Sequence, residues 1–341
     1  MRTRSLFTTL MAAGLASLLA GPAASAFTPP RAVQNAGLGI RLLDAPVDRR
    51  NDPRARIYII DHVKPGTSIT RRVQVSDNTS GPLHAAVYAG GADIDHGAFR
   101  PAARGTPSEL GQWTTATPTS VVLRAHKTAN VSITIKVPAD ASPGERYGVI
   151  WAELPPSKGS TVTEVNRVGV RIYLSVGPGG EPASDFTVDS LQATRRADGV
   201  PVVVAQIHNT GGRALDMNGT LSLSHGPAGL SAGPFPATLG TSLVPGQTEP
   251  VTVPLDQAIR GGPWSAVLEV RSGLLIRKAT AQLTFPDKGG SAGDPVQAST
   301  VPLHKDHTVR LVAVIMASLL LLLLLALALR EWLRRQRAVQ E

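Results

Sequence analysis

Apolar and polar residues alternate with a period of two along several short stretches of the chain. Residues 131–137 (VSITIKV) and 168–176 (VGVRIYLSV) place an apolar side chain at every second position. Successive side chains of a strand point to opposite faces, so this pattern predicts half-buried antiparallel strands. Further strand candidates are 39–43, 57–63, 68–76, 83–88, 119–123, 147–154, 202–208, 220–223, 250–254 and 264–271.

Clusters of Pro, Gly, Asn, Asp and Ser separate these stretches, and no amphipathic helix interrupts them. Many short strands with such turns are typical of β-sandwiches. The sequence therefore predicts an all-β fold with two tandem immunoglobulin-like β-sandwich domains, at 27–177 and 185–286. A Gly- and Pro-rich linker at 178–184 is predicted to join them.

A faint internal repeat agrees with two domains of the same kind. In the first half, a turn, an alternating stretch (131–138), a Pro-Gly loop and a second stretch (147–153) follow one another. The second half has the same succession, with stretches at 251–254 and 264–269. Turn chemistry that is common to all β-domains is the other explanation of this match.

The N-terminus has the three parts of a secretory signal peptide. Arg2 and Arg4 precede an apolar run at 6–20, and an Ala-Ser-Ala sequence ends at Ala26. This arrangement predicts a signal peptide at 1–26, which is removed on export.

The longest apolar stretch, 311–329, has nineteen residues without a charge, including seven consecutive leucines. As a helix it is about 28 Å long, close to the roughly 30 Å of a bilayer core, which predicts one C-terminal transmembrane helix. Four arginines in 330–341 predict a cytoplasmic basic tail. We therefore expect a single-pass type I protein of the cell membrane whose ectodomain faces the cell wall. Polar residues at 287–310 predict a flexible stalk that spans about 26 Å.

Composition narrows the function. The chain has no cysteine, which excludes disulfides, a thiol nucleophile and cysteine-ligated metals. The formal charge of +9 falls to about +5 once the signal peptide and the tail are set aside. A weakly basic exterior suits anionic wall polymers or a membrane surface, although solubility alone also explains it. No basic cluster points to nucleic acid.

Catalytic and metal-binding motifs are missing from the sequence, so we expect no enzyme, no cofactor and no metal site. The segment 93–97 (DIDHG) lacks the further ligands of a calcium loop and predicts a hairpin turn. His304 and His307 fit a solvated stalk better than a metal site. Glu153 and Glu164 are conceivable as a glycosidase pair, but the sequence indicates no aromatic platform for a sugar beside them.

Three tryptophans lie in informative places. Trp113 is in a stretch without strong alternation, where it could stack on a sugar ring or plug the end of a sandwich. We keep Trp113 as the one candidate ligand contact. Trp151 and Trp264 lie within predicted strands and are expected in the cores.

Four segments together carry a family likeness: 39–46 (GIRLLDAP), 63–73 (VKPGTSITRRV), 143–147 (PGERY) and 165–173 (VNRVGVRIY). They resemble the WxL-interacting protein family, and more narrowly its peptidoglycan-binding domain of actinobacterial type. The resemblance covers 37–177 and implies a Gram-positive surface protein that binds peptidoglycan or WxL-type surface proteins. The second domain does not match the host-binding module of better-known members.

These observations predict a membrane-anchored cell-surface protein that binds peptidoglycan, an anionic wall polymer or a surface-protein partner non-covalently. The competing interpretation is an extracytoplasmic assembly chaperone, because paired immunoglobulin-like domains resemble pilus chaperones and could offer a strand edge to a subunit. The only other partner expected is the lipid bilayer, through the C-terminal helix.

Overall fold

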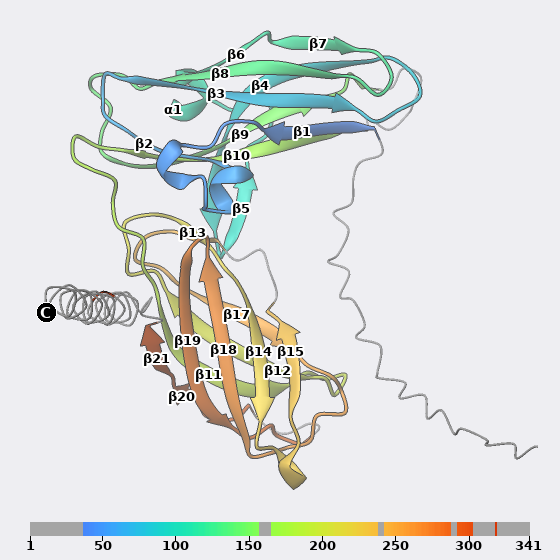
Figure 1. Cartoon of the computed structure of the whole chain (residues 1–341), viewed down its shortest axis with the longest axis vertical. Helices are drawn as coiled ribbons and strands as arrows, with labels where there is room; N and C mark the ends of the chain where they lie inside the picture. The colour runs from blue at the N-terminus through green and yellow to red at the C-terminus, as the bar shows by residue number, and fades with distance from the viewer. Residues whose placement is uncertain (1–36, 157–164, 238–241, 288–291, 303–317, 319–341) are drawn as a thin grey trace, which may run out of the picture. The chain divides into compact units, whose positions relative to one another are not determined.

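The computed structural model describes residues 37–156, 165–237, 242–287, 292–302 and 318. Strands dominate these ranges and form two sandwiches, the first between Leu38 and Val176 and the second between Thr187 and Pro302 (Figure 1). The all-β fold predicted from the sequence is confirmed.

The first sandwich contains ten strands, one short helix and two 3-10 turns. Their bounds are β1 (Leu38–Leu42), η1 (Val47–Arg49), η2 (Arg54–Arg56), β2 (Ile59–Val63), β3 (Ser68–Asp77), β4 (Leu83–Asp95), β5 (Ala98–Pro101), α1 (Glu109–Trp113), β6 (Thr114–Thr117), β7 (Ser120–Leu123), β8 (Thr128–Lys136), β9 (Gly144–Glu153) and β10 (Arg167–Val176).

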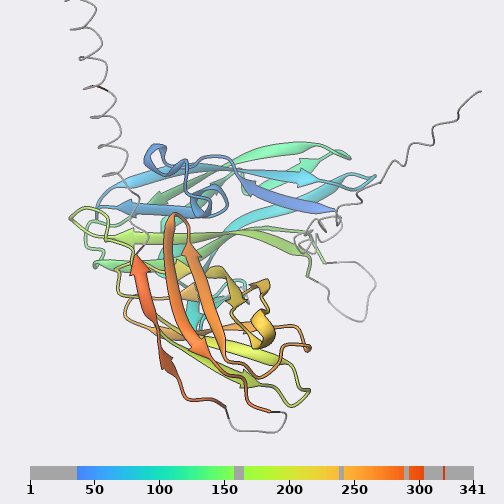
Figure 2. The same ribbon diagram turned by 60° about the horizontal axis from the view of Figure 1, so that its bottom comes forward.

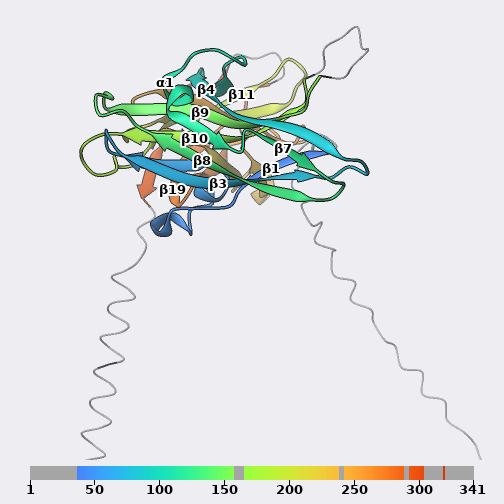
Figure 3. The same cartoon turned by 90° about the horizontal axis from the view of Figure 1, so that it is seen from above.

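The strand order of the first sandwich is that of an immunoglobulin domain. One sheet has the order β1-β3-β8-β6, and the other has β2-β10-β9-β4-β5 with β7 also paired to β4. Figure 3 shows strands of both sheets from above. In immunoglobulin nomenclature these are an A-B-E-D sheet and a G-F-C sheet, with the first strand divided between the two. β2 pairs with β10 in parallel, whereas the other pairs are antiparallel.

The second sandwich repeats the same plan. Its elements are β11 (Thr187–Arg195), β12 (Pro201–His208), β13 (Leu215–Asp216), β14 (Asn218–Ser224), η3 (Pro227–Gly229), β15 (Ala232–Pro236), β16 (Ser242–Leu243), β17 (Thr248–Pro254), β18 (Trp264–Ser272), β19 (Leu275–Leu283), β20 (Val296–Gln297) and β21 (Ser299–Pro302). The sheets have the orders β17-β12-β11-β20 and β15-β14-β18-β19-β21, and β13 pairs with β16. The stretches of the internal repeat, β8 and β9 against β17 and β18, occupy equivalent positions in the two orders.

Each sandwich has its own hydrophobic core. In β8, Val131, Ile133 and Ile135 are buried in the first core, as their period of two predicts. Trp264 at the start of β18 is buried in the second core, which confirms its expected place. Each core is enclosed by the two sheets of its own sandwich, so the chain forms two separate β-sandwich domains.

The region predicted as a stalk is partly folded. Residues of β20 pair with β11, and β21 pairs with β19, so both sheets of the second sandwich gain a strand from this region (Figures 1 and 2). The sequence did not predict these strands, because short edge strands bury few side chains and therefore need no alternation of apolar and polar residues. The second sandwich therefore continues to Pro302 instead of ending near residue 286.

The signal peptide at 1–26, the transmembrane segment at 311–329 and the tail at 330–341 lie outside the described residues, apart from Ser318. Within the part of the chain that the structure describes, no helix has the length and apolarity needed to cross a membrane.

Candidate functional site

The outward side of the β2-β10-β9-β4-β5 sheet carries a group of arginine, aromatic and acidic residues. The strand registers place Trp151 of β9 between Tyr88 of β4 and Gly169 of β10. The next pair along β9 and β10 is Glu153 and Arg167. Arg104, from the loop after β5, joins them through Glu153. We call Tyr88, Arg104, Trp151, Glu153 and Arg167 the arginine–aromatic face.

Gly169 makes room for the indole of Trp151 on this sheet. A Cβ atom added at Gly169 would lie 2.8 Å from a ring carbon of Trp151, whereas one added at Gly90 would make an ordinary contact with the ring nitrogen at 3.4 Å. Larger residues at Gly169 would collide with the ring, because real Cβ contacts are essentially never so short. The neighbours Ile150 and Ala152 point into the core, so the alternation of β9 directs Trp151 outward.

Two guanidinium groups cover the aromatic rings. The Arg167 guanidinium lies 4.3 Å from the centre of the Trp151 ring, and that of Arg104 lies 4.7 Å from the Tyr88 ring. Cations are attracted to the faces of aromatic rings at such distances. The face thus stacks guanidinium groups on aromatic rings and presents donors that suit hydroxyl, carboxylate or phosphate groups.

Glu153 organises the polar edge of the face. Glu153 is 5% exposed, and its carboxylate accepts hydrogen bonds from the Tyr88 hydroxyl and from Arg104. Burial raises the pKa of Tyr88, and the hydrogen bond to Glu153 adds to this shift. The tyrosine hydroxyl therefore stays a protonated donor at neutral pH.

An open hollow of about 440 Å³ lies beside this edge. It is lined by His84, Ala85, Ala86, Arg104, Ser120, Glu153, Leu154, Pro155 and Pro156. Two residues of the face, Arg104 and Glu153, are also in its lining. The hollow and the aromatic rings thus form one continuous surface, with a size suited to one or two small ring systems.

This arrangement corrects two expectations from the sequence. Trp151 lies on the outward side of the sheet, partly exposed, and not in a core. Strand position alone could not separate the two faces, since Val149, the outward neighbour of Trp151, is also apolar and buried. Glu153 does have aromatic neighbours, Tyr88 and Trp151, because β4 and β9 pair across 65 residues of sequence. Glu164, its suggested catalytic partner, lies outside the described residues.

Trp113 is placed differently. It is the last residue of α1 and packs, partly buried, against the first core. The Arg146 guanidinium lies 5.8 Å from its ring. Trp113 therefore packs against the first core and is not part of the arginine–aromatic face, so its role as a ligand contact stays a prediction.

The segment 93–97 forms the hairpin turn that the sequence predicts. Asp95 pairs with Ala98, and the two residues between them, His96 and Gly97, have φ angles of 44° and 69°. Positive φ at both central positions is characteristic of a two-residue hairpin. Over the described ranges, no three His, Asp or Glu side chains gather as a metal site would require.

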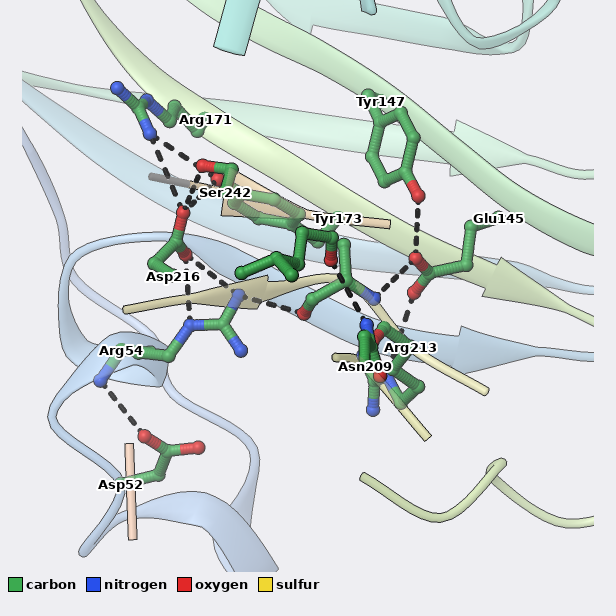
Figure 4. Close-up of polar contacts among 12 residues, drawn as sticks. Asp52, Arg54, Glu145, Tyr147, Arg171, Tyr173, Asn209, Arg213, Asp216 and Ser242 are labelled. Atoms are coloured by element: carbon green, nitrogen blue, oxygen red, sulfur yellow. Dashed lines mark hydrogen bonds and ion pairs between the residues drawn. The ribbon is translucent and has the colours of Figure 1, made fainter. Parts of the chain in front are cut away.

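A second polar cluster, which the sequence did not indicate, joins the two sandwiches (Figure 4). Asp216 of β13 accepts hydrogen bonds from Arg54 of η2 at 3.0 Å, from Tyr173 of β10 at 2.8 Å and from Ser242 of β16 at 2.7 Å. Tyr173 is buried among the rings of Tyr58, Phe99 and Tyr147. We call this group, together with Glu145 and Arg213, the junction cluster.

Glu145 provides the other half of the junction cluster. Its carboxylate accepts hydrogen bonds from the Tyr147 hydroxyl at 2.7 Å and from the backbone N–H of Ala214 at 2.6 Å. Arg213, which is 3% exposed, forms ion pairs with Glu145 and with Glu181 of the predicted linker. Burial raises the pKa of Glu145. The two domains are thus held by buried polar contacts as well as by the linker.

The chain matches no protein-family model and no curated protein. Solved structures of chaperones show some similarity. The CupB2 chaperone of Pseudomonas aeruginosa is 13% identical over 67% of this chain and 97% of that chain, with a TM-score of 0.36. The YadV chaperone is 11% identical over 76% and 99%, with a TM-score of 0.36. A chain of the SafA pilin–SafB chaperone complex of Salmonella enterica is 11% identical over 80% of this chain and 99% of that chain, with a TM-score of 0.39. Values this low assign neither a family nor a function to the chain.

Proposed function

We propose that this chain is a non-catalytic binding protein, held at the outer surface of a membrane, that binds a wall glycan on the arginine–aromatic face. The observation that carries this proposal is the arrangement of Trp151 and Tyr88 side by side on an open sheet, with arginines over both rings. The other aromatic residues on this side of the sheet, around Tyr173, are covered by the second domain.

The chemistry of the face suits sugars that carry acidic groups. The faces of pyranose rings are apolar and pack on aromatic rings, while the hydroxyl groups at their edges accept and donate hydrogen bonds. Arg104 is the most exposed donor of the face, with 58% of its side chain accessible. Arginine binds carboxylates through two parallel hydrogen bonds. Peptidoglycan, with its sugars and peptide carboxylates, and anionic wall polymers both present these groups.

The location of the protein is part of the proposal. The signal-like sequence at 1–26 and the apolar segment at 311–329 support export followed by membrane anchoring. The resemblance of 37–177 to the peptidoglycan-binding domain of WxL-interacting proteins supports a wall ligand. The arginine–aromatic face lies within that resembling region.

The test is sedimentation of the full chain, kept in detergent, with purified peptidoglycan sacculi that retain or lack their anionic polymers. We expect binding that weakens, but persists, when the salt concentration rises to about 0.5 M, because screening removes long-range attraction and leaves stacking and hydrogen bonds. Trp151→Ala is expected to weaken binding at least about tenfold, or about 1.4 kcal/mol. Arg41→Gln, an exposed arginine of the opposite sheet, is the matched control.

Two results would count against the proposal. Absence of binding to either kind of sacculus would remove the wall ligand. Binding that vanishes completely in salt, or that Trp151→Ala and Arg41→Gln reduce equally, would indicate general charge attraction instead of a site.

A second candidate function is assembly of another protein by strand pairing. β2 pairs with β10 only along Ile172–Val176, so that among the described residues no strand pairs with 167–171 on that edge. An open backbone edge accepts an extended segment of a partner. A chaperone for an exported subunit would use it in this way.

The two functions differ in what protects β10. A subunit seated on the edge would slow hydrogen exchange of amides in 167–171, whereas a glycan on the outward side of the sheet would not replace their hydrogen bonds. Co-purification of one unfolded subunit with such protection would favour the chaperone function over glycan binding.

A further inference from the structure

The strands from the predicted stalk fix where the chain leaves the second sandwich. β21 ends at Pro302, whose backbone pairs with Arg277 near the start of β19. Only eight residues then separate Pro302 from the apolar segment that begins at Leu311. Their fully extended length is about 30 Å. An anchored chain therefore keeps this end of the second sandwich within about 30 Å of the bilayer.

Two segments at this end of the sandwich touch each other. The turn between β18 and β19 contains Gly273, and a Cβ atom added there would lie 2.5 Å from a carboxylate oxygen of Asp52. Asp52 belongs to the loop that carries η1 and η2. That loop is also pinned to the second domain by the hydrogen bonds of Arg54 to Asp216 and to the Ala214 carbonyl. The turn and the loop thus form one surface next to the exit of the chain.

This surface exposes apolar side chains. Leu274 in the turn is 63% exposed, and Val47 and Ile57 at the two ends of the loop are 76% and 55% exposed. Single exposed apolar residues are ordinary on protein surfaces. Three on two touching segments, at the place where a membrane anchor departs, are not explained by that rule.

Arginines accompany these apolar residues. Arg50 and Arg56 are exposed, and Arg56 donates a hydrogen bond to the Arg50 carbonyl. The loop 47–57 contains four arginines and two aspartates, and one of these, Asp52, is engaged by the Arg54 backbone N–H and by Arg49. The surface therefore combines exposed apolar side chains with a net positive charge, the combination that binds at the interface of anionic bilayers.

We propose that the loop 47–57 and the turn 272–275 dock on the lipid headgroups of the membrane that anchors the chain, with Val47, Ile57 and Leu274 inserted among them and Arg50 and Arg56 beside headgroups of net negative charge. This inference rests on the proposed anchoring. Docking would hold the junction cluster close to the bilayer, since Arg54 links the docking loop to Asp216.

The test uses the absence of cysteine from the chain. Single-cysteine variants Leu274→Cys and Ile57→Cys of the full chain carry an environment-sensitive fluorophore in vesicles of phosphatidylcholine and phosphatidylglycerol. Val122→Cys is the matched control, because Val122 is 67% exposed and lies at the opposite end of the first sandwich, paired with His84. We expect blue-shifted emission and quenching by a nitroxide lipid at 274 and 57, and neither at 122.

The outcomes separate docking from anchoring. Flotation of the same vesicles shows whether the chain is anchored, and a chain that does not float overturns both the anchoring and the docking. A chain that floats, with labels at 274 and 57 as accessible to aqueous iodide as the label at 122, overturns docking alone.

The charge contribution has its own test. The double variant Arg50→Gln, Arg56→Gln is expected to reduce lipid quenching at 274 in anionic vesicles and to leave it unchanged in vesicles of phosphatidylcholine alone. Equal quenching of the variant and the parent in anionic vesicles would overturn the proposed contacts with headgroups of net negative charge.

Discussion

At each end of β9 a glutamate of the strand contacts a tyrosine and an arginine, but the surroundings of the two groups differ. Near its start, Glu145 accepts a hydrogen bond from Tyr147 and pairs with Arg213. At its end, Glu153 accepts hydrogen bonds from Tyr88 and Arg104. The first group is covered by the second domain, through Arg213 and the Ala214 N–H, and the second borders an open hollow.

The difference shows that coverage by the second domain decides whether such a cluster joins the domains or stays free to bind a ligand. In the junction cluster, Arg54, Tyr173 and Ser242 all donate to the Asp216 carboxylate, so the energy of these contacts goes into joining the domains. In the arginine–aromatic face, Arg104 keeps more than half of its side chain in solvent and can exchange water for a ligand. The comparison predicts large stability effects at the covered end and binding effects at the open end.

Removing the central carboxylate of the junction has the largest expected effect. Asp216→Ala leaves Arg54, Tyr173 and Ser242 without their shared acceptor in a poorly hydrated place. Breaking a buried pair in this way costs about 3 kcal/mol of unfolding free energy. Chemical denaturation of the full chain, followed by tryptophan fluorescence, measures the loss.

The control is Asp140→Ala, which removes an exposed carboxylate from the loop after β8. It is expected to change the unfolding free energy by less than about 0.5 kcal/mol. Equal effects of the two changes would mean that the junction contributes no more than the surface does.

The second prediction concerns how the unfolding free energy depends on pH at the covered end of β9, where Glu145 lies. Burial raises the folded-state pKa of Glu145 above its usual value of 4.5. A carboxyl of this kind stabilises the folded state fully below its unfolded pKa, and this contribution is lost as pH rises through the folded pKa. We therefore expect the unfolding free energy of the parent, relative to Glu145→Gln, to fall as pH rises from about 4 towards 7. Denaturation curves across that range provide the measurement.

Glu109→Gln serves as the control, because Glu109 pairs with Arg146 at an exposed place. The unfolding free energy of the parent, relative to Glu109→Gln, is expected not to fall as pH rises from about 4 towards 7. A flat profile for Glu145→Gln would contradict the raised pKa of Glu145.

At the open end, the indole of Trp151 has a moderate effect on stability and a large one on binding. Trp151→Ala removes ring surface that is only partly buried and leaves the core intact, so the unfolding free energy is expected to fall by about 1 kcal/mol. Trp151→Phe retains a flat ring over Gly169 and is expected to keep most of the binding to sacculi. If both variants lose binding equally while remaining folded, ring stacking is not the source of affinity.

The sequence predicted the architecture well and the site poorly, for physical reasons. Alternation along β8 and β10 reports the side of a strand that faces a core, so the sheets and the place of Ile135 followed from it. The same pattern predicted a buried Trp151, because its outward neighbour Val149 is also apolar and buried. The space for the Trp151 ring on the outward side depends on Gly169, which lies on another strand, β10.

The junction cluster was beyond prediction for a related reason. Arg54 and Asp216 are 162 residues apart, and neither belongs to a recognisable motif. One weak signal was present: Glu145, Tyr147, Arg171 and Tyr173 are polar or aromatic at outward positions of two long strands that pair with each other. Such a concentration indicates that something covers that side of a sheet, although it does not reveal what.

The smallest expected effect on stability belongs to Arg104. Its ion pair with Glu153 is exposed on the arginine side, and such pairs contribute about 0.5 kcal/mol or less. Arg104→Gln keeps a hydrogen-bond donor near Glu153 and Tyr88, so the unfolding free energy is expected to change by no more than that. Binding to sacculi is expected to weaken about threefold to tenfold at low salt, because a charge-assisted bond to a ligand carboxylate is lost. Since screening already removes most of this attraction at about 0.5 M salt, the variant and the parent are expected to bind alike there. A loss of stability of about 3 kcal/mol, as at Asp216, would instead show that the two ends of β9 are both structural, and the distinction between a covered and an open cluster would fail.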